Sequence, residues 1–68
     1  TVNPIELVWH RDYENRKVTV LESNDWEFQF DNELPFTLEV GNTIDIPRGT
    51  YHRIIKGNGN LVLDIEEY

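Results

Sequence analysis

The sequence predicts a small all-β domain, and three observations support this fold class. Short segments alternate apolar and polar residues, which is the period-two pattern of half-buried strands. Turn-forming residues separate these segments at nearly even spacing, as they do in β-sandwiches and β-barrels. Strand-like segments dominate after residue 16, so no helix longer than two turns is expected beyond Lys17.

The expected strands follow one another closely along the chain. The second one shows the alternation most clearly: Trp26, Phe28 and Phe30 should share one buried face, while Glu27 and Gln29 should be exposed. Turn signals rich in Gly, Pro, Asn and Asp lie between the strands. The full set of expected strands covers residues 17–22, 26–30, 36–40, 44–46, 50–55 and 61–66.

The N-terminal residues allow two interpretations. Residues 3–6 (Asn-Pro-Ile-Glu) resemble a helix start, with an N-cap residue, a proline at the first helical position and an acid at the third. Apolar residues also alternate over 5–9, as they would in a strand. Because everything downstream is β, we expect a strand over 5–13 that forms a hairpin with the strand beginning at Lys17.

Length and composition limit how the chain can be stabilised. Its 68 residues allow a single domain, 1–68, with an N-terminal strand or arm over 1–16 and barrel strands over 17–66. A core this small is marginal, and the chain has no cysteine for disulfides or thiolate metal sites. We therefore expect a homodimer. The expected contact is the apolar run Leu7, Val8 and Trp9.

The charge of the chain argues against two classes of partner. Thirteen acidic residues and six basic ones give a formal net charge of −7. Such a surface repels phosphate backbones and anionic lipid, so neither nucleic acid nor a membrane is an expected partner. No stretch is apolar for long enough to span a bilayer, and a cytoplasmic location is the expectation.

One segment carries a recognisable motif. Gly41, Pro47, Gly49 and His52 have the spacing G-x5-P-x-G-x2-H, and Lys56 stands where the motif ends in Asn. Gly41 suits a turn with positive φ, and Pro47 suits the end of a strand. The segment resembles the second motif of the cupin superfamily. That resemblance implies a small cupin-like jelly-roll barrel or a rolled antiparallel sheet.

The first cupin motif is only partly present. In the alignment that the resemblance implies, His10 matches the first histidine, Asp12 replaces the second, and Lys17 replaces the glutamate. Pro4 and Asn24 stand where the motif has glycines. The metal ligands that the resemblance implies for this chain are therefore His10, Asp12 and His52.

Two observations oppose a metal at these residues. An ammonium group at Lys17 would repel a cation if it occupied the fourth ligand position. If Leu7 and Trp9 face the core, His10 and Asp12 point outward, because one step along a strand reverses the face. We therefore expect no cofactor, with a divalent metal (Fe, Mn, Ni or Zn) as the alternative.

Three functions remain open from the sequence. The first is a non-enzymatic mini-cupin that acts as a binding or assembly module. The second is a metal-dependent cupin enzyme, a small oxygenase or isomerase, that uses His10, Asp12 and His52. The third is a metal-free cupin that binds a sugar or a small anion. The candidate ligand-binding residues are Lys17, Tyr51 and His52. Whether the protein is an enzyme is undecided, and the first function is preferred.

Overall fold

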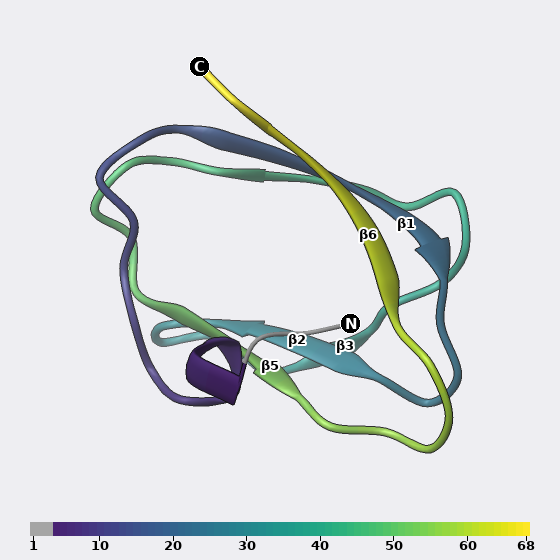
Figure 1. Ribbon diagram of the computed structural model, residues 1–68. Coiled ribbons are helices and arrows are strands. Elements are labelled where there is room, and N and C mark those ends of the chain that lie inside the picture. The colour runs from purple at the N-terminus through teal and green to yellow at the C-terminus, as the bar shows by residue number, and fades with distance from the viewer. Residues whose placement is uncertain (1–3) are drawn as a thin grey trace.

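The computed structural model describes residues 4–68, and it consists of two three-stranded antiparallel sheets that face each other (Figure 1). The strand orders are β4-β1-β6 and β3-β2-β5. The predicted all-β class is confirmed, because one short 3-10 helix is the only helical element among these residues. The two sheets do not close into a barrel within the described part of the chain.

The first sheet is built on β1 (Arg16–Glu22), which lies between β4 (Thr43–Ile46) and β6 (Val62–Glu67). Val18 pairs with Ile44 on one side and with Ile65 on the other. The pairing with β6 shifts by one residue between Val20 and Glu22, which is a β-bulge.

The second sheet is built on β2 (Glu27–Phe30), which lies between β3 (Phe36–Thr37) and β5 (His52–Ile55). β5 pairs with β2 along all four of its residues, from His52 opposite Phe30 to Ile55 opposite Glu27. This complete pairing gives β5 a well-defined register.

The core lies between the two sheets. Inward positions alternate along the strands, as the burial of Val18 and Val20 on β1 and of Ile44 and Ile46 on β4 shows. Trp26 and Phe28 are buried as predicted, whereas Phe30, Glu27 and Gln29 are half-buried. The buried apolar residues are Val18, Val20, Trp26, Phe28, Leu38, Ile44, Ile46, Ile54 and Leu61.

Five of the six predicted strands are found within two residues of their expected bounds, and the exception is the strand predicted over 36–40. Regular pairing ends at Thr37, although the Leu38 amide still donates to the Trp26 carbonyl at 2.8 Å. The chain then turns, because the Glu39 amide donates to the Asn42 side chain and the Asn42 amide to the Glu39 carbonyl, both at 2.9 Å. This local turn replaces the last two residues of the expected strand.

Both glycines of the recognised motif adopt positive φ, +92° at Gly41 and +83° at Gly49. L-residues with a Cβ rarely take this conformation, so each glycine has a direct backbone role. Gly41 precedes β4, and Gly49 lies in the connection from β4 to β5. β4 ends at Ile46, immediately before Pro47, as predicted.

The predicted N-terminal hairpin is wrong. Residues Pro4–Leu7 form the 3-10 helix η1, which matches the alternative interpretation of a helix start, although Asn3 lies outside the described residues. β1 pairs with β4 and β6, so both of its edges are occupied and no N-terminal strand can add to it. The N-terminal segment lies instead beside β5 (Figure 1). No helix in the described part of the chain is long and apolar enough to cross a membrane.

Candidate functional site

Two histidines from distant parts of the sequence meet beside β5. The amide of His10 donates to the carbonyl of His52 at 3.1 Å, and the amide of His52 donates back at 2.9 Å. This antiparallel bridge brings the two imidazole rings to a centroid distance of 4.3 Å, edge to face. Phe28 stacks on the His52 ring at 5.5 Å, which holds that ring against the core.

Both imidazole rings are oriented by the same local contact. Nδ1 of His10 lies 2.8 Å from the Val8 carbonyl, and Nδ1 of His52 lies 2.8 Å from the Thr50 carbonyl. A carbonyl oxygen can only accept, so each Nδ1 carries a proton and donates it. In the neutral imidazole, this leaves a lone pair on Nε2 of both histidines.

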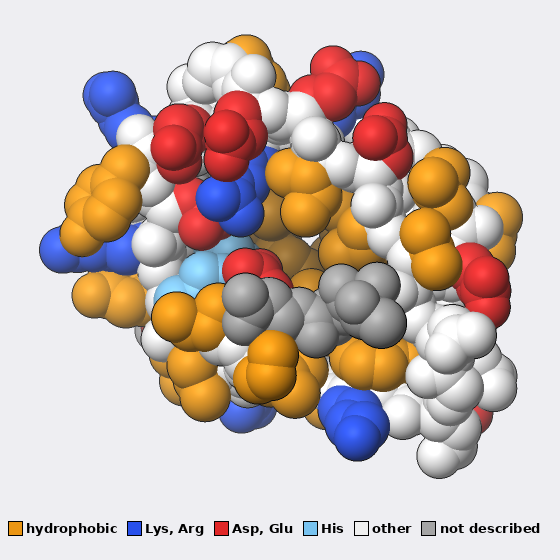
Figure 2. Space-filling view, in the orientation of Figure 1, with side chains coloured by type: hydrophobic (Ala, Val, Ile, Leu, Met, Phe, Trp, Pro, Cys, Tyr) orange, Lys and Arg blue, Asp and Glu red, His pale blue; other side chains and the backbone are white. Residues whose placement is uncertain are grey.

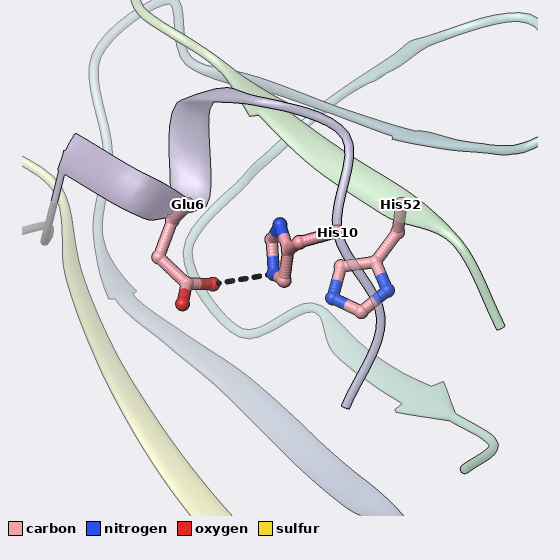
Figure 3. A group of neighbouring side chains, drawn as sticks. All are labelled: Glu6, His10 and His52. Atoms are coloured by element: carbon pink, nitrogen blue, oxygen red, sulfur yellow. Dashed lines mark ion pairs between the residues drawn. The ribbon is translucent and has the colours of Figure 1, made fainter. Parts of the chain in front are cut away.

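A carboxylate faces Nε2 of His10. Glu6, on the 3-10 helix, places Oε1 3.2 Å from this nitrogen (Figure 3). Ligand atoms of Glu6, His10 and His52 all lie within 4.8 Å of one another. Two ring nitrogens and a carboxylate oxygen this close together could hold one divalent metal ion.

A second carboxylate faces Nε2 of His52. Oδ2 of Asp12 lies 3.3 Å from that nitrogen, while Oδ1 lies 3.4 Å from the Arg16 guanidinium. Arg16 also contacts Glu67 at 3.1 Å. The Asp12 carbonyl accepts from the Gly49 amide at 2.8 Å, which anchors the segment next to the glycine turn of the motif.

The polar atoms of this cluster are incompletely satisfied. Nε2 of His10 and Oδ2 of Asp12 are buried and have no hydrogen-bond partner among the described residues. His52 is only 2% exposed, and this burial lowers the pKa of its imidazole. The Thr50 carbonyl raises that pKa, the nearby His10 lowers it, and the Asp12 and Glu6 carboxylates raise it. The lowered pKa favours the neutral imidazole, in which the Nε2 lone pair faces the Asp12 carboxylate.

A small cavity lies between the sheets beside the cluster. Its volume is about 20 Å³, enough for one water-sized molecule. Figure 2 shows histidine and acidic side chains beside a hollow with hydrophobic walls. Glu6 and His52 are the polar residues of the cavity wall, and the apolar ones are Val18, Phe28, Leu38, Ile44, Ile46, Ile54, Leu63 and Ile65.

A larger hollow, of about 470 Å³, lies elsewhere on the molecule. Trp26 and Lys56 line it, but none of the predicted site residues does. Its remaining walls come from Pro4, Leu7, Gly59, Asn60, Leu61 and Val62. This hollow has the size of a small-molecule pocket, whereas the cavity beside the histidines does not.

The prediction that His10 and Asp12 point outward is wrong. Asp12 is only 8% exposed, and the His10 ring packs against the ring of the buried His52. The prediction used Leu7 to set the phase of a strand, but Leu7 is the last residue of η1. The turn of η1 breaks the alternation before His10, so the phase does not carry across it.

The predicted ligand-binding residues Lys17, Tyr51 and His52 do not come together. Lys17 is exposed on β1, where the inward positions are those of Val18 and Val20. Tyr51 directly precedes the inward-facing His52. The Tyr51 ring lies beneath the guanidinium of Arg11, whose Cζ is 5.3 Å from the centroid of that ring. Because Lys17 points away from the histidines, its charge does not oppose a cation there.

Glu6 is the residue that the sequence analysis missed. From the sequence, Glu6 is the acid of a helix start, and Lys17 stands at the glutamate position of the motif. The spacing of Glu6 and His10, four residues apart at the end of a helix signal, could have indicated their contact. The predicted dimer contact stays a prediction: Leu7 is half-buried in its own chain, while Val8 and Trp9 are exposed.

No family model, curated protein or solved structure matches this chain. The candidate site therefore depends on the chemistry of its own residues.

Proposed function

We propose that this protein is a cupin-like binding module that holds a divalent transition metal between Nε2 of His10, Nε2 of His52 and the carboxylate of Glu6. One observation carries the proposal. Both histidines direct Nδ1 at a backbone carbonyl, so that Nε2 of His10 faces Glu6 and Nε2 of His52 faces Asp12, with ligand atoms of Glu6, His10 and His52 all within 4.8 Å of one another. Asp12 places a further carboxylate oxygen 3.3 Å from Nε2 of His52, but it lies outside the group of ligand atoms within 4.8 Å of one another.

The electrostatics of this arrangement favour a cation. A lone pair that faces a carboxylate oxygen at 3.2–3.3 Å is repulsive unless a positive charge lies between them. A proton could supply that charge, but burial disfavours protonation of His52. A metal ion supplies it without protonating either ring. In metal-bound histidines, the N–H of the ring nitrogen that does not bind the metal commonly donates to a carbonyl, as Nδ1 of His10 and of His52 does here.

The donor set indicates the class of metal. Imidazole nitrogen combined with carboxylate oxygen suits Zn²⁺, Fe²⁺, Mn²⁺ or Ni²⁺. Three protein donors leave a coordination position open for water or a ligand, as in catalytic zinc sites. The adjoining cavity has room for one water-sized molecule. A larger substrate has no space there, and this is why we propose a binding module in preference to an enzyme.

The cupin-like assignment is supported by three features of the motif region. Gly41 and Gly49 have the positive φ that the motif glycines are expected to need. His52 begins a strand and faces inward. The two antiparallel sheets that face each other across one core are compatible with a rolled sheet of the cupin type.

Calorimetric titration of chelator-treated protein with Zn²⁺, Ni²⁺ and Mn²⁺ tests the proposal. We expect one site per chain, and we expect His52→Asn and Glu6→Gln to weaken binding by about 10- to 100-fold or more. Asn at position 52 keeps a donor for the Thr50 carbonyl but removes Nε2. The matched control is Glu14→Gln, an exposed acid outside the cluster. Equal affinity of the wild type and His52→Asn would refute the site.

A further inference from the structure

The bridge between His10 and His52 organises a second surface on the opposite face of the same sheet. Because these two residues pair antiparallel, Trp9 lies opposite Arg53 and Arg11 opposite Tyr51. The Arg53 guanidinium lies over the Trp9 ring at 4.8 Å, and the Arg11 guanidinium over the Tyr51 ring at 5.3 Å. The two cation–π pairs lie side by side and point away from the histidines.

Among the described residues, neither guanidinium on this surface has an acidic partner. Arg11 forms no ion pair within residues 4–68, and Arg53 only donates from Nε to the Gln29 side chain at 2.9 Å. Arg16, by contrast, contacts both Asp12 and Glu67. In a chain with thirteen acidic residues, two neighbouring unpaired arginines stacked on rings are a local positive surface.

The backbone beside these side chains is an unpaired strand edge. His10 directs its amide and carbonyl to β5, so the amides and carbonyls of Trp9 and Arg11 point the other way. In the described part of the chain, none of these four groups has a hydrogen-bond partner. Two donors and two acceptors on an exposed edge are a template for one more strand.

We propose that this edge binds an extended acidic segment of a partner protein, which adds as a strand beside residues 9–11. An incoming strand places alternate side chains on one face, so an acid at every second position would lie beside Trp9 and Arg11. Carboxylates there can reach the free guanidinium edges, whose planar donors match a carboxylate. The expected recognition pattern is acid-x-acid, with backbone pairing for affinity and the two arginines for specificity.

The charge of the whole chain favours a short acidic peptide over two other occupants. Nucleic acid would extend its phosphates beyond the two arginines onto a molecule with net charge −7. A second copy of the chain, whose expected contact is Leu7, Val8 and Trp9, would bring a second net charge of −7 to this edge, and the repulsion between the copies favours the peptide there. A peptide with two or three carboxylates satisfies both arginines and adds little charge elsewhere.

Fluorescence anisotropy with a labelled peptide of alternating Thr and Glu is the test. We expect binding that weakens as salt is raised, and we expect replacement of each Glu by Gln to weaken it by at least about tenfold. A third peptide keeps the Glu residues but is N-methylated on the amides of the pairing edge. We expect about tenfold weaker binding of this peptide, because methylation removes the donors of the added strand.

Variants of the protein locate the surface. Arg11→Gln and Arg53→Gln should each weaken the Glu peptide by about tenfold. Arg48→Gln makes the same charge change on an exposed arginine that stacks on no ring among the described residues, and it should have little effect. Circular dichroism checks that each variant keeps its fold.

Three results would overturn the proposal. The first is equal binding of the Glu and Gln peptides. The second is tighter binding of a single-stranded oligonucleotide than of the Glu peptide. The third is a dimer in sedimentation equilibrium that becomes a monomer on Arg53→Gln, which would make a second copy the occupant.

Discussion

Strand β5 and the N-terminal segment before β1 each bring one histidine to the candidate site, but the fold holds them differently. β5 is paired to β2 over its whole length, and both His52 and Ile54 are buried. The N-terminal segment has one bridge to β5, a short helix without a buried residue, and Asp12 as its one buried side chain within residues 4–15. Half of the site is thus part of the core, while the other half is fastened by a few polar contacts.

This difference has a consequence for metal binding. Ordering a segment with few apolar contacts costs conformational entropy that little burial offsets. A metal held by Glu6 and His10 on one side and by His52 on the other would join the segment to the core. The proposed ion therefore has a structural effect as well as a binding role.

The largest expected difference between the two regions lies in their apolar contacts. Phe28, which pairs with Ile54 and stacks on His52, contacts two more rings, of Phe30 at 4.9 Å and Phe36 at 5.6 Å. We expect Phe28→Ala to lower the free energy of unfolding by about 3–5 kcal/mol, a large share of the stability of so small a domain. Trp9→Ala, in the N-terminal segment, should cost about 1 kcal/mol or less, because it removes a half-exposed ring and one cation–π contact.

Urea titrations followed by circular dichroism measure both variants. Leu34→Ala is the control, since Leu34 is 87% exposed, and it should change stability by less than about 0.5 kcal/mol. Similar losses for Phe28→Ala and Trp9→Ala would contradict the contrast between the regions.

The next largest effect on the free energy of unfolding should come from metal binding. At 100 times its dissociation constant, a ligand that binds only the folded state adds about 2.7 kcal/mol of stability. We expect the gain in amide hydrogen-exchange protection to be largest over residues 8–15, because that segment is otherwise the less protected one. Uniform protection across both regions, or protection that His10→Asn leaves unchanged, would argue against a metal that fastens the segment.

Asp12 links the N-terminal segment to the core through both carboxylate oxygens, which contact Arg16 and His52. Asp12→Ala should cost about 2 kcal/mol, since it leaves the half-buried Arg16 without its partner on the segment. Asp12→Asn should cost clearly less in metal-free protein, because its amide can donate to the Nε2 lone pair of His52. Thermal unfolding in chelator compares the two, and an equal loss would imply that Nε2 is already protonated.

A smaller effect is expected from pH. The lowered pKa of His52 means that the unfolded chain takes up a proton at higher pH than the folded one. The contribution of His52 to the free energy of unfolding should therefore be constant above about pH 6.5, which is the pKa of histidine in the unfolded chain. It should fall as the pH drops below that pKa. The Tm of His52→Asn should fall less over the same range. A wild-type Tm that rises on acidification to pH 6 would contradict the burial of a neutral imidazole.

The sequence predicted the core half of the site better than the segment. Alternation and the two motif glycines were enough to expect a strand that carries His52, because those signals are local. The path of residues 4–15 depends on contacts with β5, Gly49 and Arg16, which no local pattern records. The outward direction of Lys17 follows from the alternation of β1, because Val18 and Val20 set its inward phase, whereas the motif alignment places Lys17 at a ligand position.

In the proposed site, both histidines carry their proton on Nδ1 and leave Nε2 free for a cation. Two-dimensional ¹H–¹⁵N NMR of the imidazole nitrogens, recorded at pH 8 in chelator and again with one equivalent of Zn²⁺, tests it directly. We expect both rings as the Nδ1–H tautomer in chelator, and we expect both Nε2 resonances to shift when Zn²⁺ is added. An Nε2–H tautomer at either histidine, or Nε2 resonances that Zn²⁺ leaves unchanged, would contradict the account.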